Sequence, residues 1–161
     1  IREVAGLLSN EAIAKGVSVE LELDMALPPI QADAIQIQQV ILNLARNGME
    51  AMTENQPGRS PRRLVIRSAH DSDGTALIAV QDNGPGIPEG ISRRVFDPFF
   101  TTRVPGMGMG MGLPICRTII EAHAGTLWFQ TETGEGTTFY FSLPVDTPRK
   151  ETESKTAPAP A

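Results

Sequence analysis

Apolar positions in the N-terminal half of the chain recur with two different periods. Residues 1–15 carry apolar side chains at helical spacing, and Gly16 ends that pattern. Residues 17–23 alternate apolar and polar positions, which is typical of a strand with one buried face. A second helix is predicted over 33–52, with Asp33 placed to cap its first turn. The side chains expected on the buried stripe of the first helix are Ile1, Val4, Leu7, Leu8, Ala12 and Ile13.

The C-terminal half predicts two pairs of strands around a third helix. The first pair is expected at 64–69 and 76–81, joined by a hairpin turn at 71–74. A helix is expected over 113–123, and the second pair of strands follows at 126–131 and 137–143. This order predicts an α/β two-layer sandwich: one mixed, mainly antiparallel sheet of about five strands, with about three helices on one face.

We expect three parts along the chain: an N-terminal helix over 1–15, one folded domain over 16–145 and a disordered tail over 146–161. The tail consists mainly of Pro, Ala, Lys, Glu and Thr, which offer little apolar surface to bury. Because the chain begins inside a helical pattern without an initiator Met, we expect it to be a piece of a longer protein.

Composition argues against several classes of function. The net charge of −5 and the lack of a long basic run disfavour a nucleic-acid surface, which needs clustered Lys and Arg. Cys116 is the single cysteine, so an internal disulfide is impossible and a reducing compartment is favoured. The sequence has no apolar run of membrane-spanning length and no signal peptide. We therefore expect a cytoplasmic domain without direct membrane contact, whose parent protein could still be membrane-anchored.

Four short blocks, in one order, carry the candidate chemistry. The first is Asn43-Leu44-Ala45-Arg46-Asn47, whose two asparagines share a helix face. An amide oxygen is a hard ligand, and magnesium on a nucleotide takes only one or two protein oxygens. We assign Asn47 as the Mg²⁺ ligand and place Asn43 beside the metal; the alternative is a pair of polar residues on a solvated face.

The second block, Asp82-Asn83-Gly84-Pro85-Gly86, follows a predicted strand. An ionised carboxylate only accepts hydrogen bonds, so Asp82 suits the amine of adenine and disfavours guanine, which has a carbonyl there. Gly84 and Gly86 would let the backbone pass close to the purine. The alternative is an ordinary Asx turn, since these residues are also good turn formers.

The third and fourth blocks flank a long loop. Phe96, Phe99 and Phe100 are expected to be core residues that anchor one end of this loop. The alternating Gly-Met run over 106–112 leads into the third helix, where backbone N–H groups can bind phosphate oxygens. Arg103 is the nearest cation for the γ-phosphate, or else an exposed arginine without a role.

Together the blocks resemble the catalytic and ATP-binding domain of sensor histidine kinases, in the superfamily shared with DNA gyrase, the mismatch-repair ATPase and the large heat-shock chaperone. The segment 39–52 resembles the N box, 82–87 and 110–113 the two glycine boxes, and 96–102 the F box. The resemblance implies the Bergerat fold, with ATP and Mg²⁺ bound and Thr137 supporting Asp82 through a hydroxyl or water. The implied nucleotide-binding residues are Asn43, Asn47, Asp82, Gly84, Gly86, Ile87, Phe99, Thr101, Thr102, Arg103, Gly108, Met109, Gly110, Met111, Gly112, Leu113 and Thr137, of which Asn43, Asn47 and Arg103 would be catalytic.

The implied reaction is transfer of the γ-phosphoryl group to a histidine on a separate dimerisation domain of the same protein, and from there to a response regulator. This chain, which lacks that domain, is expected to be monomeric and its parent homodimeric. Gly48 departs from the Ala usual in the family and is expected to weaken the helix by about 1 kcal/mol. Three alternatives remain: an ATPase of the gyrase or chaperone kind, a serine kinase, and a non-catalytic module that senses nucleotide and docks a partner.

Overall fold

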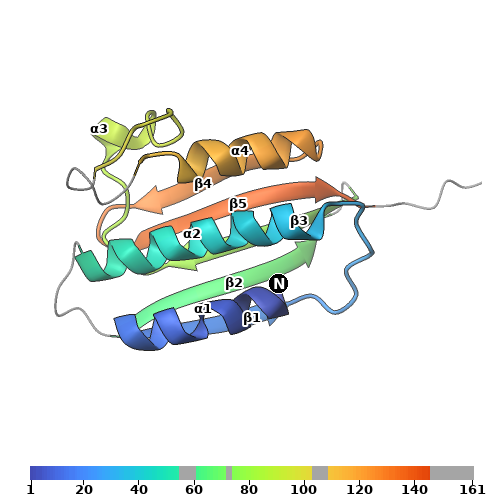
Figure 1. Cartoon of the computed structure of the whole chain (residues 1–161), viewed down its shortest axis with the longest axis horizontal. Coiled ribbons are helices and arrows are strands. Elements are labelled where there is room, and N and C mark those ends of the chain that lie inside the picture. Colours follow the sequence, from blue (N-terminus) through green and yellow to red (C-terminus); the bar gives the residue numbers. More distant parts are fainter. Residues whose placement is uncertain (55–60, 72–73, 103–108, 146–161) are drawn as a thin grey trace, which may run out of the picture.

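The computed structural model describes residues 1–54, 61–71, 74–102 and 109–145. One sheet holds five strands in the spatial order β1-β2-β3-β5-β4, and α1, α2 and α4 cover one of its faces (Figure 1). The pair β1–β2 is parallel and the other pairs are antiparallel, which confirms the mixed, mainly antiparallel sandwich. In chain order the elements are α1 (Arg2–Lys15), β1 (Val17–Leu23), α2 (Ala34–Glu54), β2 (Arg62–His70), β3 (Thr75–Asp82), α3 (Glu89–Ser92), α4 (Gly112–Ala122), β4 (Thr126–Glu132) and β5 (Gly136–Pro144).

The predicted elements are all present, with ends that differ by one or two residues. The short helix α3, within the long loop before α4, was not predicted. Asp33 caps α2 as expected, because its Oδ1 accepts the N–H groups of Ile35 (2.9 Å) and Gln36 (3.1 Å). The N–H of Asp33 donates to Nε2 of His123 (3.0 Å), which links the start of α2 to the end of α4. The tail over 146–161 and residues 72–73 of the hairpin turn lie outside the described residues.

The core lies between the sheet and the helices, and α1 contributes a narrower stripe to it than predicted. Val4, Leu8 and Ala12 are buried, whereas Leu7 is 59% and Ile13 78% exposed. The expectation for those two residues is therefore wrong. The buried residues Val4, Leu8 and Ala12 are spaced by four positions and therefore lie on one line along the helix. The main contacts of α1 with other elements are those with β1 and α2. Only that one line of side chains reaches the core.

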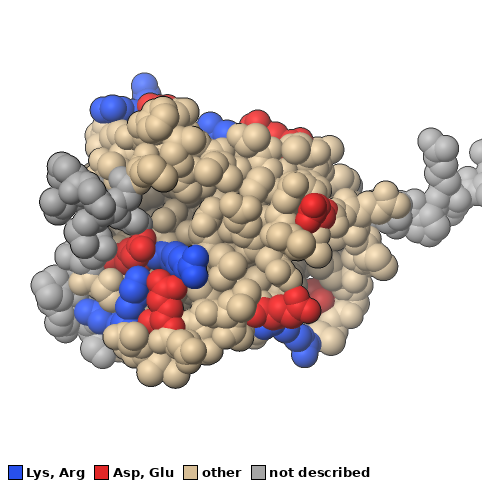
Figure 2. All heavy atoms as spheres, viewed as in Figure 1, with Lys and Arg blue, Asp and Glu red and all other residues tan. Residues whose placement is uncertain are grey.

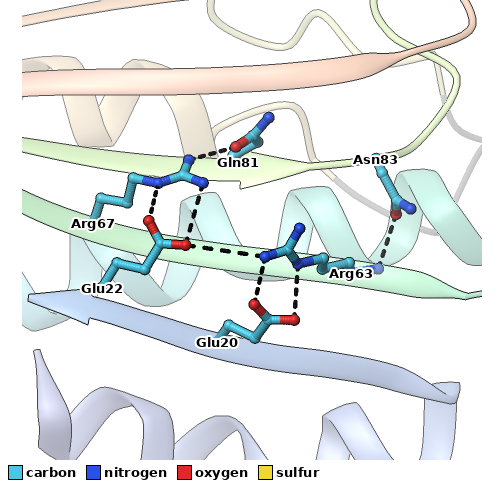
Figure 3. A network of polar contacts seen from close by, with 6 residues as sticks. All are labelled: Glu20, Glu22, Arg63, Arg67, Gln81 and Asn83. Carbon is cyan, nitrogen blue, oxygen red and sulfur yellow. Dashed lines mark hydrogen bonds and ion pairs between the residues drawn. The ribbon is translucent and has the colours of Figure 1, made fainter.

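The opposite face of the sheet carries a ladder of polar side chains across β1, β2 and β3 (Figure 3). Arg63 pairs with both carboxylate oxygens of Glu20 (2.8 and 2.6 Å), and Arg67 pairs with Glu22 (2.5 Å). Asn83, just after β3, accepts the N–H of Arg63 (2.8 Å) and donates to the carbonyl of Pro61 (2.9 Å). These contacts tie the end of β3 to the beginning of β2, and so hold the strand end that carries Asp82.

On the helix-covered face, one cluster of acidic and basic side chains lies over α1 and α2, and other charged side chains lie apart from it (Figure 2). Glu11 pairs with Lys15 (3.1 Å) and with Arg46 (3.0 Å), joining α1 to α2. Such partly exposed pairs contribute little to stability individually. Among the helices of the described segments, none combines the length and apolar character required to cross a bilayer.

Candidate functional site

Asp82 is the buried polar centre of the candidate site. It ends β3, lies directly opposite Thr137 of β5, and is 6% exposed. Burial raises the pKa of its carboxyl from 3.8 to about 6, although hydrogen bonds from the backbone N–H groups of Gly84 and Thr137 act in the opposite direction. The Gly84 N–H lies 2.9 Å from Oδ1. A carboxylate with two such donors still has lone pairs for further hydrogen bonds from a ligand.

Helix α2 passes directly over this carboxylate at Gly48. A Cβ on Gly48 would lie 3.0 Å from Cδ1 of Leu64 and 3.1 Å from Cβ of Asp82. The glycine therefore allows close approach of helix and strand, a role that the helix-propensity argument missed.

The two asparagines of α2 are half-buried and lie one helical turn apart on the same face. Asn47 immediately precedes Gly48, which places it at the level of Asp82 along the helix. The thiol of Cys116 on α4 donates to the carbonyl of Val40 (3.8 Å). Burial raises the pKa of this thiol to about 11, and hydrogen bonding with the nearby Asn43 side chain acts in the opposite direction. Asn43 is thus directed toward α4. The roles of both asparagines toward a metal remain predictions.

The loop after Asp82 is attached to the β4–β5 hairpin. Gly86 has φ +76°, and a Cβ there would lie 2.4 Å from the carbonyl oxygen of Glu132, so a side chain would clash with the backbone. The N–H of Ile87 donates to Oγ1 of Thr131 (2.8 Å), and the N–H of Gly134 donates to the carbonyl of Pro85 (2.7 Å). The hairpin therefore fixes the glycine-containing loop.

Phe96 is partly buried and packs against the core rather than lying within it. It packs against Phe129 and Phe139 with ring centroids 5.9 and 6.4 Å apart. The guanidinium of Arg117, on α4, lies 3.9 Å from the Phe96 ring centroid. This contact fixes α4 to the start of the third block.

Phe99 is not a core residue, which corrects the sequence prediction. It is 76% exposed and has φ 64°, a backbone conformation that is uncommon for residues other than Gly. Its N–H donates to the carbonyl of Gly110 (3.1 Å), and a Cβ on Gly110, whose φ is also +64°, would lie 2.6 Å from the carbonyl oxygen of Phe100. The third and fourth blocks are therefore in direct contact.

The remaining predicted residues border this contact or fall outside the described segments. Thr101, Thr102 and Met109 are exposed, and Met111, Gly112 and Leu113 are partly exposed at the start of α4. Arg103 and Gly108 lie outside the described residues. The end of α2, the loop with α3 and the start of α4 occupy the same end of the molecule (Figure 1).

Thr131 is a contact residue that the sequence reasoning missed. The hydroxyl of Thr131 lies 3.0 Å from the hydroxyl of Thr137. The backbone N–H of Thr137 hydrogen-bonds the carboxylate of Asp82. Alternation offered a signal, because counting two residues from Phe129 and from Phe139 puts Thr131 and Thr137 on the core face. Their pairing across β4 and β5 required the register.

Comparison with known proteins identifies similar chains. A sequence model of the family described as "Histidine kinase-, DNA gyrase B-, and HSP90-like ATPase" matches residues 32–147. The sensor histidine kinase TmoS of Ectopseudomonas mendocina is 41% identical over 86% of this chain and 14% of its own length. The sensor protein FixL of Bradyrhizobium diazoefficiens is 38% identical over 90% of this chain and 28% of its own length. This chain thus spans less than a third of either relative.

Solved structures share the fold. The nucleotide-free catalytic domain of histidine kinase ThkA has a TM-score of 0.74 and 35% identity, covering 89% of this chain and 88% of that one. Full-length ShkA in complex with AMPPNP has a TM-score of 0.77 and 29% identity, covering 89% of this chain and 28% of that one. ThkA in complex with the response regulator TrrA has a TM-score of 0.70 and 33% identity, covering 92% and 40%.

Proposed function

Because this chain belongs to the family of histidine kinase-, DNA gyrase B- and HSP90-like ATPases, we propose that it binds ATP with Mg²⁺ and acts as the phosphoryl-donating domain of a sensor histidine kinase. The acceptor would be a histidine on a separate dimerisation domain of the same parent protein, which would be a homodimer. A response regulator would then receive the phosphoryl group, and the chain would lie in the cytoplasm, where ATP is available. The observation that carries the proposal is the buried carboxylate of Asp82 beside a loop shaped by glycine.

Asp82 would recognise adenine. Its carboxylate is buried, held by backbone N–H groups, and able to accept one more hydrogen bond from an exocyclic amine. The neighbouring loop through Gly86 and Ile87 is fixed by the β4–β5 hairpin, so its backbone can form a preorganised wall for the purine.

The start of α4 would bind the phosphates. Gly110 brings the backbone of the fourth block against Phe99 and Phe100, and Gly112 opens α4. The free N–H groups and the dipole of a helix N-terminus favour phosphate oxygens. Thr101, Thr102, Met109, Met111 and Leu113 border this position, and Arg103 with Gly108 would complete it.

The residues present fit Mg²⁺ held mainly by phosphate and water. Asn47 offers a hard amide oxygen from α2, which suits a metal that takes few protein ligands. Within the described part of the chain, no group of three or more His, Cys, Asp or Glu could form an all-protein metal site. Asn47 would hold the ion, which when bound neutralises charge on the phosphates.

Phosphoryl transfer is favoured over efficient ATP hydrolysis. Gyrase-like and chaperone-like ATPases resemble this chain but carry a carboxylate one turn before the metal-binding asparagine, where this chain has the amide of Asn43, which cannot act as a general base. Glu50 is the nearest carboxylate along the helix, and its Oε1 lies 4.0 Å from Nζ of Lys15 on α1. That contact extends the Glu50 side chain toward α1.

The test combines binding and transfer. We expect calorimetry to show binding of a nonhydrolysable ATP analogue with Mg²⁺, a loss of about 1.5–3 kcal/mol in Asp82→Ala, and loss of the Mg²⁺ dependence in Asn47→Ala. Asp24→Ala and Asn10→Ala, an acidic residue and a helical asparagine elsewhere in the fold, are the matched controls. With labelled ATP, a separately produced dimerisation domain should become labelled on histidine. Binding without any transfer would favour a docking module, and rapid release of free phosphate would favour an ATPase.

A further inference from the structure

We propose that Thr131 is a positioning residue for the adenine site, which sets the direction of the Thr137 hydroxyl and makes the base-reading edge accept hydrogen bonds only. The proposal rests on the proposed function of this site as an ATP site. It concerns the preference for adenine over guanine.

The Thr131 hydroxyl has three polar neighbours from two other parts of the chain. Oγ1 accepts the N–H of Ile87 at 2.8 Å, donates to the carbonyl of Gly136 at 3.1 Å, and lies 3.0 Å from Oγ1 of Thr137. Ile87 belongs to the glycine-containing loop, and Gly136 and Thr137 are the first two residues of β5. One hydroxyl therefore joins the loop wall to the strand that faces Asp82.

Counting hydrogens assigns the direction of the bond between the two threonines. A threonine hydroxyl has one hydrogen and two lone pairs. Thr131 uses its hydrogen toward the carbonyl of Gly136 and one lone pair toward the N–H of Ile87. The second lone pair can then accept the hydrogen of Thr137. In the reverse direction, the Thr131 hydrogen would leave the Gly136 carbonyl, and one of the three contacts would be lost. The complete arrangement has Thr137 as the donor.

This direction determines what a ligand meets. Thr137 is opposite Asp82 in one register pair and opposite Thr131 in the next, so the three side chains lie in one row on the core face of the sheet. With its hydrogen directed at Thr131, the Thr137 hydroxyl presents lone pairs only. Beside the ionised carboxylate of Asp82, it forms an edge that favours the amine of adenine, or a water donating to it, and repels the carbonyl of guanine.

The experiment compares the ATP-to-GTP affinity ratio across threonine variants. Thr131→Val keeps the shape of the side chain and removes the hydroxyl, whereas Thr131→Ser keeps the hydroxyl. Thr138→Val, on the opposite face of β5, is the control for losing a strand hydroxyl. Dissociation constants for nonhydrolysable ATP and GTP analogues are measured by calorimetry, and folding is followed by circular dichroism.

We expect Thr131→Val to lower the ATP-to-GTP ratio by about tenfold, the order of one lost hydrogen bond, while Thr131→Ser and Thr138→Val stay within about twofold of the wild type. An unchanged ratio in a folded Thr131→Val protein overturns the inference. If Thr131→Val fails to fold, Thr131→Ala is measured instead. A ratio lowered by about tenfold then supports the inference, and an unchanged ratio overturns it. Absence of ATP binding by the wild type overturns the proposed function itself, whereas binding with an unchanged ratio in the variant overturns this inference alone.

Discussion

Replacing Asp82 by Asn is expected to change how the stability of the domain depends on pH. The carboxyl of Asp82 has its pKa raised by burial from 3.8 to about 6, and no charged partner offsets that desolvation among its identified causes. The native state therefore keeps a proton on Asp82 at pH values where the unfolded chain has released it. Stability gained from this residue is complete below the unfolded pKa and is lost as the pH rises through about 6.

The size of the effect follows from the two pKa values. The interval from 3.8 to about 6 corresponds to about 3 kcal/mol between the low-pH and high-pH limits, at about 1.4 kcal/mol per pKa unit. Of this, about 1.4 kcal/mol falls between pH 5 and pH 8. Asn has no proton to release, and its amide oxygen can still accept the N–H of Gly84, so the Asp82→Asn protein lacks this component of the pH dependence.

The assay is urea unfolding followed by circular dichroism at a series of pH values from about 5 to 8. The free energy of unfolding of Asp82→Asn minus that of the wild type should rise by about 1.4 kcal/mol across the series. All other titrating groups are common to both proteins, so their contributions cancel in the difference. The packing of the new amide adds only a constant that does not depend on pH. Asp24→Asn, in the segment after β1, controls for the loss of one negative charge.

Parallel stability curves for wild type and Asp82→Asn would refute this reasoning. They would mean that the carboxyl of Asp82 is already well solvated or compensated in the folded chain. A difference that falls with rising pH would mean that the carboxylate is net stabilised, and the site would then hold a cation-like partner for Asp82.

The remaining predictions concern the nucleotide and the loop. Because adenine recognition needs the carboxylate form, the affinity of the wild type for an ATP analogue should weaken up to about tenfold per pH unit below about pH 6, and calorimetry that finds constant affinity from pH 5 to 8 would contradict the role of Asp82. Gly86→Ala should destabilise by more than about 2 kcal/mol in urea unfolding, because its φ of +76° is unfavourable and the new Cβ would lie 2.4 Å from the Glu132 carbonyl oxygen. Gly134 has φ +88°, and a Cβ added there would have no atom within 4 Å, so Gly134→Ala measures the conformational cost alone. Equal losses of unfolding free energy in Gly86→Ala and Gly134→Ala would exclude the clash.

The layout of the fold could be predicted because each element has a local signal. Asp33 marks the start of α2 by its capping side chain, and alternation marks the strands. The extent of burial could not be predicted in the same way. Leu7 and Ile13 are apolar and on a helix, but α1 lies at the edge of the sheet beside β1, where a helix has neighbours along only one line. Periodicity reports which positions could be buried together, and the number of neighbours depends on the placement of the element.

In the candidate site, too, the residues with a local sequence signal could be predicted, and their contacts with distant segments could not. Asp82 could be identified because a strand followed by Asp-Asn-Gly-Pro-Gly is a local pattern. Its surroundings come from distant segments: Gly48 from α2, Thr137 from β5 and, through Thr137, Thr131 from β4. Phe99 shows the reverse failure, because its hydrophobicity predicted burial, whereas the side chain is 76% exposed on a loop that contacts Gly110.

Stability and ligand recognition oppose each other at Asp82. A solvated carboxylate would stabilise the domain more at neutral pH, but water would then compete with the adenine amine for its lone pairs. Gly48 lets α2 approach within contact distance of Asp82, which keeps the carboxylate buried, and the N–H groups of Gly84 and Thr137 hold it without supplying a full positive charge. The carboxylate still has lone pairs for a further hydrogen bond, which a bound adenine amine would supply. The feature that makes the free domain less stable as the pH rises is thus the same feature that would make nucleotide binding selective.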